Sequence, residues 1–142
     1  MNGKAFLDTN IFVYTFDARE PAKQDCARQL VAQALSHQQG VTSFQVIQEF
    51  LNVATRKFVQ PLSHADCRDY LEHVLAPLCE VFASVELYRL ALDTAERWHY
   101  AFYDSLIIAA AVQAGCRGLY SEDLQHGQRI GSLTITNPFV LS

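Results

Sequence analysis

The sequence lacks the segments that mark membrane and secreted proteins. Its longest uninterrupted apolar run covers residues 106–112, whereas a membrane-spanning helix needs roughly 20 apolar residues. The N-terminal segment M-N-G-K-A-F-L-D has no apolar core followed by a cleavage site, so it does not read as a signal peptide. We therefore expect a cytoplasmic protein that makes no membrane contact.

Basic residues are also scarce. The chain has 11 Lys and Arg against 15 Asp and Glu, a net charge of −4, whereas nucleic-acid-binding domains are usually basic. Any attraction to phosphate must therefore come from local patches or from a bound metal ion. Charged residues make up only 18% of the 142 residues and hydrophobic residues 50%, a composition typical of a compact folded domain.

Motifs of cysteine and glycine are missing as well. The four cysteines form no C-x-x-C pair, which excludes a zinc ribbon, so we expect buried, reduced thiols: Cys26, Cys67, Cys79 and Cys116. The chain contains neither G-x-x-x-x-G-K-[ST] nor G-x-G-x-x-G, which argues against a nucleotide-binding module.

Short apolar strands alternate with amphipathic helices along the whole chain. Strands are predicted at residues 5–7, 41–43, 79–82, 118–120 and 133–136, and helices at 20–38, 44–58, 63–74, 84–98 and 103–114. We expect Ser43 to cap the helix that follows it. Such alternation indicates a single α/β domain over residues 1–142, a three-layer α/β/α sandwich around a mainly parallel sheet.

Four carboxylates stand out against this pattern. Asp8 and Asp123 follow predicted strands, Asp104 opens the most apolar helix, and Glu49 lies at the edge of an apolar helix face. Each has an ordinary structural explanation: Asp8 as a turn cap, Asp104 as a helix N-cap, Asp123 as a loop acid and Glu49 as a solvated side chain. Ligands of parallel sheets, however, bind beyond the carboxyl ends of the strands.

Four carboxylates at one end of a sheet repel one another unless protons, basic side chains or a cation neutralise them. No Lys or Arg adjoins Asp8, Asp104 or Asp123 in the sequence. Oxygen ligands without Cys or His favour Mg²⁺ or Mn²⁺ over zinc, and a carboxylate-held Mg²⁺ typically acts on phosphates.

The order of the acids points to a known family. The segments F-L-D-T-N, Q-E-F-L-N, Y-D-S-L-I-I-A-A-A and S-E-D-L resemble those of the PIN-domain nucleases, most closely the VapC-like toxin ribonucleases of prokaryotic toxin–antitoxin pairs. The resemblance covers residues 6–139. It implies that the four acids bind metal and that nearby polar residues support them; these supporting residues are Thr9, Asn10, Ser121 and Glu122. Whether Glu122 or Asp123 points into the site stays open, with Asp123 preferred because it matches the family position.

The resemblance also implies an activity and partners. We expect a Mg²⁺- or Mn²⁺-dependent endoribonuclease that hydrolyses RNA, is neutralised by a cognate antitoxin protein and forms a homodimer. Asp8 and Asp104 would hold the main ion, Asp123 would complete its shell, and Glu49 would hold a second ion or act through water. Candidate RNA contacts are Arg56, Lys57, Arg97 and Tyr103.

Two alternatives come from other classes. A haloacid-dehalogenase-like phosphatase also carries an Asp after its first strand, but it requires a second Asp two residues later, where this chain has Asn10. The other alternative is a non-catalytic partner-binding module that has kept the fold, against which the complete set of four acids argues.

Overall fold

The computed structural model, which describes residues 3–140, contains one six-stranded sheet with the order β3-β2-β1-β4-β6-β5. The first five strands in this order are parallel, and β5 is antiparallel to β6. The strands are β1 (Ala5–Leu7), β2 (Gly40–Ser43), β3 (Cys79–Val81), β4 (Gly118–Tyr120), β5 (Arg129–Ile130) and β6 (Leu133–Thr136). All five predicted strands are confirmed.

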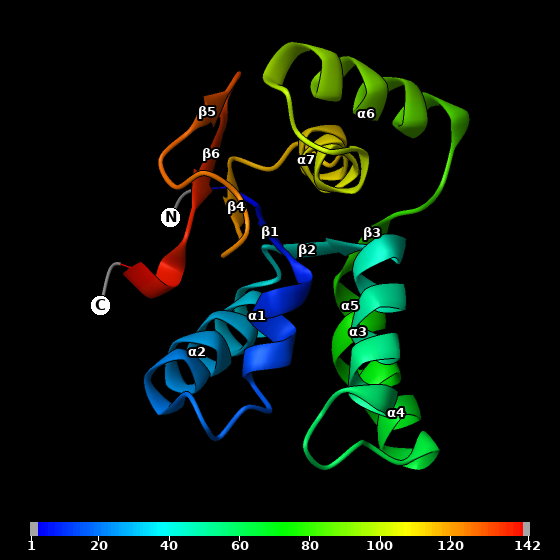
Figure 1. The fold of residues 1–142 in the computed structure, drawn as a ribbon, viewed down its shortest axis with the longest axis vertical. Helices are drawn as coiled ribbons and strands as arrows, with labels where there is room; N and C mark the ends of the chain where they lie inside the picture. Colours follow the sequence, from blue (N-terminus) through cyan, green and yellow to red (C-terminus); the bar gives the residue numbers. More distant parts are fainter. Residues whose placement is uncertain (1–2, 141–142) are drawn as a thin grey trace.

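Helices cover both faces of this sheet, which confirms the predicted three layers (Figure 1). One face carries α1 (Thr9–Tyr14), α2 (Pro21–His37), α3 (Phe44–Arg56), α4 (His64–Tyr70), the π-helical turn η1 (Leu71–Leu75) and α5 (Ala76–Leu78). The other face carries α6 (Val85–Trp98) and α7 (Phe102–Gln113), and a 3-10 turn, η2 (Pro138–Val140), follows β6. None of the helices in residues 3–140 combines the length and the apolar character that crossing a bilayer requires.

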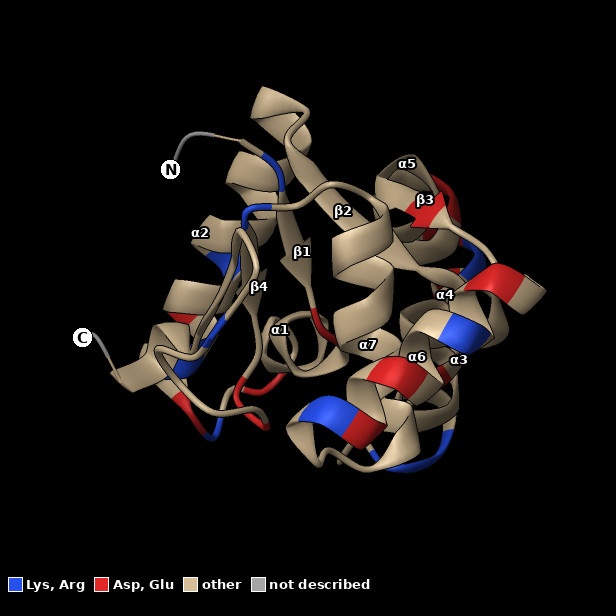
Figure 2. Cartoon of the chain, turned by 90° about the horizontal axis from the view of Figure 1, so that it is seen from above, with Lys and Arg blue, Asp and Glu red and all other residues tan. Residues whose placement is uncertain are grey.

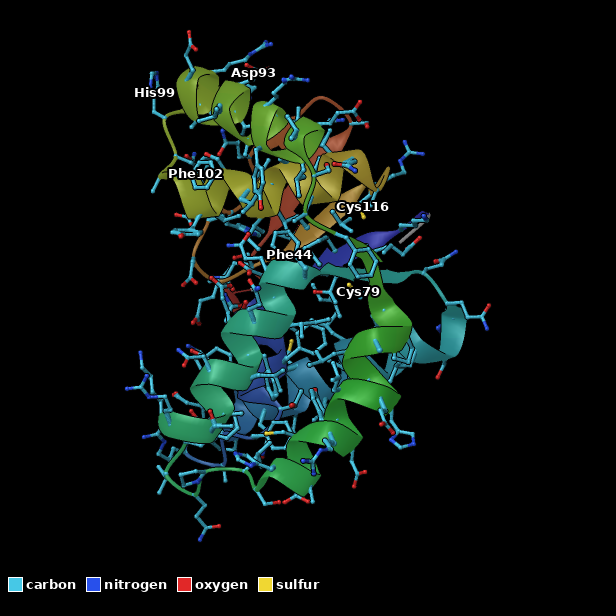
Figure 3. All side chains as sticks on the ribbon, turned by 90° about the vertical axis from the view of Figure 1, so that its right-hand side faces the viewer. Phe44, Cys79, Asp93, His99, Phe102 and Cys116 are labelled. Carbon is cyan, nitrogen blue, oxygen red and sulfur yellow. The ribbon has the colours of Figure 1, made fainter. Side chains whose placement is uncertain are left out.

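Helix α7 is buried from Ser105 to Ala111. A helix that is apolar all round needs cover on every side. The sheet covers α7 on one side and α6 covers it on the other. Figure 3 shows α6 as the outermost helix on that side. Opposite, the core continues through Phe6, Phe12 and Phe50, which are fully buried.

Some local predictions were wrong. The predicted helix 63–74 extends to Leu78 and contains a π-helical turn, in which the Ala76 N–H donates to Leu71 O, five residues earlier. Pro77 explains the irregularity, because its ring clashes with the carbonyl group four residues before it in a regular helix. The short strand β5 also escaped prediction. It exists only because Ile130 and Leu133 pair across a tight turn in which Gly131 has a φ of 60°.

Ser43 does not cap α3 with its side chain, although it is the residue before the helix. Its Oγ is buried and has no hydrogen-bond partner within the described chain. Ser43 is also the last residue of β2, and the pleat of the strand sets the direction of its side chain. The cysteines are free thiols as predicted, but only Cys67 and Cys116 are buried, and the other two are half-buried.

The strands β1, β2 and β4 all end at the same edge of the sheet because they run parallel. Figure 2 shows acidic residues directly after β1 and after β4 at this edge. Helices α1 and α3 follow β1 and β2 with at most one intervening residue. The architecture therefore carries the side chains of these two helices to the carboxyl edge.

Candidate active site

Asp8 occupies the junction between β1 and α1 and is only 7% exposed. It is the N-cap of α1, and its Oδ1 accepts a hydrogen bond of 2.7 Å from the Thr9 N–H. Its Oδ2 accepts a second bond of 2.7 Å from Ser121 Oγ. Burial raises the pKa of Asp8 to about 6 even though both hydrogen bonds act in the opposite direction, and the charges of Glu49 and Asp123 add to the rise. The turn-cap explanation is thus correct but incomplete, because a cap does not require burial beside other acids.

Glu49 reaches the same edge from α3. Its Oε1 accepts a hydrogen bond of 2.6 Å from Thr9 Oγ1, and its Oε2 lies 3.4 Å from Gln45 Nε2. The explanation of Glu49 as a freely solvated side chain is therefore wrong. Thr9 joins Glu49 to the residue that follows Asp8, which fits its predicted supporting role.

Asp104 lies in the first turn of α7, which begins at Phe102 with Ala101 as its N-cap. The N-cap explanation for Asp104 is therefore wrong, because the helix starts earlier than the apolar pattern indicated. Partial burial raises the pKa of Asp104, and the negative charges of Asp123 and Glu49 raise it further. Glu49 and Asp123 are therefore close enough to Asp104 to oppose its ionisation.

Asp123 and Glu122 point in different directions. Asp123 Oδ2 accepts a hydrogen bond of 3.2 Å from Asn10 Nδ2, on the side of the other acids. Glu122 instead binds Lys23 Nζ and the Tyr14 hydroxyl, each at 2.6 Å. This geometry agrees with the preference for Asp123 as the residue that faces the site.

Ser121 connects Asp8 to Asp123. Its side chain is fully buried; Oγ donates to Asp8 and accepts a bond of 3.2 Å from the Asp123 N–H. Asn10 also binds the loop backbone, since its Oδ1 accepts from the Glu122 N–H at 3.3 Å. Both residues hold carboxylates in place, the kind of role predicted for them.

The donor set fits a hard divalent cation. Within residues 3–140, no three Asp, Glu, His or Cys side chains are arranged to enclose a single ion. Mg²⁺ does not need such a cage, because it keeps several water molecules and usually binds one or two carboxylates directly. Buried or half-buried carboxylates with raised pKa values are what a site for such an ion provides. Asp8 and Asp104 both have raised pKa values, and the charges of Glu49 and Asp123 act on each of them.

The predicted RNA contacts are exposed on the surface of the protein. Tyr103 is 69% exposed and precedes Asp104, so it is the nearest of them to the acids in sequence. Arg56 and Arg97 are exposed at the ends of α3 and α6, and Arg97 lies over the Trp98 ring. Lys57 lines a groove of about 530 Å³ between α1 and α3.

Three residues near the acids were missed in the sequence. Gln45 is 5% exposed, and its Nε2 also donates to Tyr103 O at 3.2 Å, so it links α3 to the start of α7. Its spacing of four residues from Glu49, which places the two on one helix face, is a signal that could have identified it. Tyr14 and Lys23 left no such signal, because Glu122, which they bind, is far away in the chain.

Comparison with known proteins agrees with this architecture. The family model described as the PIN domain matches residues 5–128. The chain belongs to the PIN domain family. This membership decides against the haloacid-dehalogenase-like alternative. No curated protein matches the chain at a significant level.

Solved structures show the same PIN fold in toxins. A toxin–antitoxin complex from Klebsiella pneumoniae aligns with a TM-score of 0.65 and 16% identity, over 95% of this chain and 98% of that one. VapC20 of Mycobacterium tuberculosis, a toxin that cleaves the sarcin–ricin loop, aligns with a TM-score of 0.57 and 20% identity, over 84% and 90%. VapBC2 of Rickettsia felis, bound to a DNA fragment from its promoter, aligns with a TM-score of 0.61 and 16% identity, over 92% and 96%. At these identities the likeness establishes the fold.

Proposed function

We propose that this PIN domain is a Mg²⁺- or Mn²⁺-dependent endoribonuclease and the toxin of a toxin–antitoxin pair. One observation carries the proposal: the charges of two acids act on two others from distant parts of the chain, and within residues 3–140 none of the four forms an ion pair with a basic side chain. The four are Asp8, Glu49, Asp104 and Asp123. Such a cluster needs a cation, and a cation held by carboxylates binds phosphate oxygens.

When bound, a Mg²⁺ or Mn²⁺ ion would acidify a water molecule and neutralise charge on the phosphoryl oxygens. Asp8 and Asp104 would hold this ion, and Asp123 would complete the site. Ser121 and the Thr9 N–H fix the Asp8 carboxylate through its two oxygens. The site is thereby arranged before RNA arrives, so that little reorganisation is needed during the reaction.

Glu49 has a different role in this scheme. Thr9 and Gln45 each donate to one of its two oxygens, which orients the carboxylate toward the other acids. It would hold a second ion or accept the proton of the attacking water. Hydrolysis then breaks the bond between phosphorus and the leaving oxygen of the RNA backbone.

The related structures support the choice of RNA and of an antitoxin. VapC20 is a toxin that cleaves the sarcin–ricin loop, and two other neighbours are toxin–antitoxin assemblies. We carry these properties to this chain as part of the proposal, together with the homodimer that the family resemblance implies. Arg56, Lys57, Arg97 and Tyr103 remain candidates for contacts with the RNA backbone and bases.

The test is cleavage of a mixed pool of structured RNAs by the purified protein with Mg²⁺, with Mn²⁺ and with EDTA. The variants are Asp8→Asn and Asp104→Asn, and Asp93→Asn is the matched control, because Asp93 is exposed on the outermost helix α6 (Figure 3). We expect cleavage that requires metal, is lost in both site variants and persists in the control. Equal trace activity in all four proteins, with or without EDTA, would instead favour the non-catalytic binding module.

A further inference from the structure

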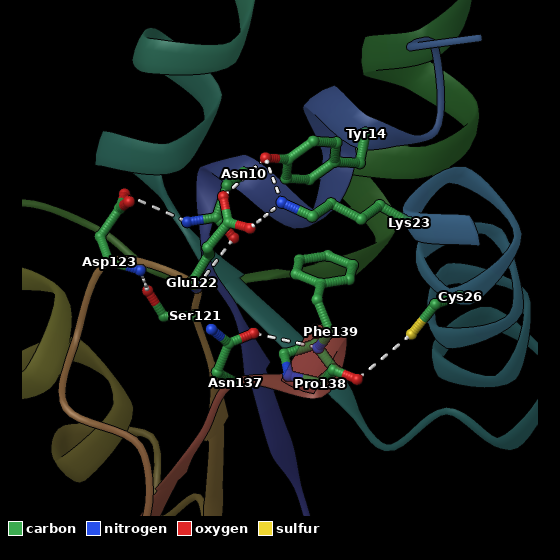
Figure 4. A network of polar contacts seen from close by, with 10 residues as sticks. All are labelled: Asn10, Tyr14, Lys23, Cys26, Ser121, Glu122, Asp123, Asn137, Pro138 and Phe139. Carbon is green, nitrogen blue, oxygen red and sulfur yellow. Dashed lines mark hydrogen bonds and ion pairs between the residues drawn. The ribbon is translucent and has the colours of Figure 1, made fainter. Parts of the chain in front are cut away.

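The Glu122 side chain is held by Tyr14 of α1 and Lys23 of α2. Its Oε1 accepts a hydrogen bond of 2.6 Å from the Tyr14 hydroxyl, and its Oε2 accepts one of 2.6 Å from Lys23 Nζ (Figure 4). Lys23 Nζ also lies 3.3 Å from the Tyr14 oxygen, so the three polar groups form a closed triangle. Residues from α1, α2 and the loop after β4 therefore meet at one point.

Aromatic rings fix the position of the Lys23 ammonium group. Its Nζ lies 5.0 Å from the centre of the Tyr14 ring and 5.7 Å from that of Phe139, distances at which a cation is attracted to a ring face. The two rings pack edge to face with their centres 4.9 Å apart. The contacts of Lys23 with Glu122 and Tyr14 raise its pKa, so it stays charged at neutral pH.

The backbone beside Glu122 leads directly to the proposed metal site. The Glu122 N–H donates to Asn10 Oδ1, while Asn10 Nδ2 donates to Asp123 Oδ2. The Asp123 side chain is exposed, so packing alone does not fix it. Its orientation depends on where the loop backbone lies.

We propose that Tyr14, Lys23 and Glu122 form a positioning device, the Glu122 clamp, which fixes the loop 121–123 so that Asp123 faces Asp8 and Asp104. None of the three residues is a metal ligand or touches substrate. The clamp acts through the loop backbone and through Asn10. Its effect on metal binding rests on the proposed function, whereas its effect on the loop does not.

A second ion pair in the molecule provides a matched control. Lys4 and Glu80 contact each other at 3.1 Å with side chains 43% and 46% exposed. Lys4 precedes β1 and Glu80 lies in β3, and neither residue contacts the loop 121–123. Loss of this pair removes a Lys–Glu contact without loosening the clamp.

The experiment compares wild type with Lys23→Met, Lys23→Arg and Lys4→Met. Hydrogen exchange of the Glu122 and Asp123 amides, followed by NMR in metal-free protein, reports on the loop. Calorimetric titration with Mn²⁺ reports on the site without any RNA. We expect several-fold faster exchange and about tenfold weaker Mn²⁺ binding in Lys23→Met, the usual size of an effect from residues that orient metal ligands. Lys23→Arg, which keeps the charge and the ring contacts, and Lys4→Met should stay close to wild type.

Unchanged amide exchange in Lys23→Met would overturn the clamp, and so would faster exchange with unchanged Mn²⁺ affinity. A contribution to stability alone would lower the thermal midpoint of Lys23→Met and leave Mn²⁺ binding intact, which also counts against it. If wild type binds no Mn²⁺, the proposed function fails, and the exchange of the two amides then decides on its own whether the clamp holds the loop.

Discussion

The most unusual residue in the molecule is Asp8, a carboxylate that is buried among other carboxylates. A buried acid is normally neutralised by a basic partner, but the partners of Asp8 are the Thr9 N–H and the Ser121 hydroxyl. These neutral donors orient the carboxylate without cancelling its charge. The uncancelled charge of Asp8 therefore destabilises the folded protein, and a bound cation would remove this destabilisation.

Metal-free protein should lose stability as the pH rises from about 4 to about 6. The pKa of Asp8 rises from 3.8 to about 6 on folding, so in this window the folded chain binds more protons than the unfolded chain. This rise in the pKa of Asp8 corresponds to about 3 kcal/mol in the free energy of unfolding. Asp8→Asn keeps an acceptor for the Thr9 N–H and removes the charge. The metal-free variant should therefore be more stable than metal-free wild type at pH 7.5.

Urea denaturation at several pH values measures this difference. Comparison of wild type with Asp8→Asn isolates Asp8 from carboxylates that shift the other way, such as Asp17, whose pKa Arg19 lowers through a hydrogen bond. Added Mn²⁺ should stabilise wild type at pH 7.5 and leave the variant unchanged. If the free energy of unfolding varied with pH in the same way for both proteins, the charge of Asp8 would not destabilise the folded state.

Gln45 is the second residue on which the site depends. Gln45→Leu removes the amide contacts to Glu49 and to Tyr103 O, and it also removes the buried Oε1, which has no partner within the described chain. We expect a loss of RNA cleavage of about 10- to 100-fold with little loss of stability, because an unpaired buried oxygen disappears as well. Gln48→Leu, an exposed position on the same helix, is the control, and an equal loss in both variants would contradict the role of Gln45.

At the scale of the elements, close junctions between strands and helices set the positions of the acids. Asp8 is the one residue between β1 and α1, and α3 follows β2 directly, which brings Glu49 to the edge of the sheet. The geometry of these junctions depends on a fixed spacing between the helices and the strands. Gly40, at the start of β2, is the point of closest approach to α2, since a Cβ atom there would lie 2.2 Å from Ala34 Cβ.

Gly40→Ala should therefore destabilise the fold by about 1–3 kcal/mol, the usual cost of overpacking. The double variant Ala34→Gly/Gly40→Ala removes the clashing methyl group and should be more stable than Gly40→Ala alone, despite the cost of about 1 kcal/mol for glycine inside a helix. The midpoints of urea denaturation measure both effects. Strictly additive losses in the double variant would mean that the two positions do not meet.

The elements also show what a sequence can and cannot predict. Periodic apolar residues predicted the sheet and the longer helices, because burial repeats along the chain in a simple way. Helix α1 was missed because its apolar residues, 11–14, span only about one turn after polar Thr9 and Asn10, too few to show a helical period. The orientation of Glu122 was open for a different reason: it depends on Lys23, 99 residues away, and no local pattern encodes such a contact.

Considering the protein as a whole, the proposed function requires a chain with a net charge of −4 to attract a polyanion. Acidic residues follow β1 and β4 at the carboxyl edge of the sheet (Figure 2), where their field repels phosphate. A divalent cation reverses the sign of that field at the point where RNA must bind. The proposed function therefore requires the metal for RNA binding as well as for the chemistry.

The most direct test of this account is therefore metal binding, which needs no knowledge of the RNA target. Calorimetric titration of wild type, Asp104→Asn and Asp93→Asn with Mn²⁺ at pH 7.5 compares a site acid with an exposed acid on α6. We predict that wild type and Asp93→Asn bind Mn²⁺ with the same affinity and that Asp104→Asn binds at least about tenfold more weakly. Equal affinity in all three proteins, or no binding to wild type, would contradict the claim that these carboxylates form a metal site.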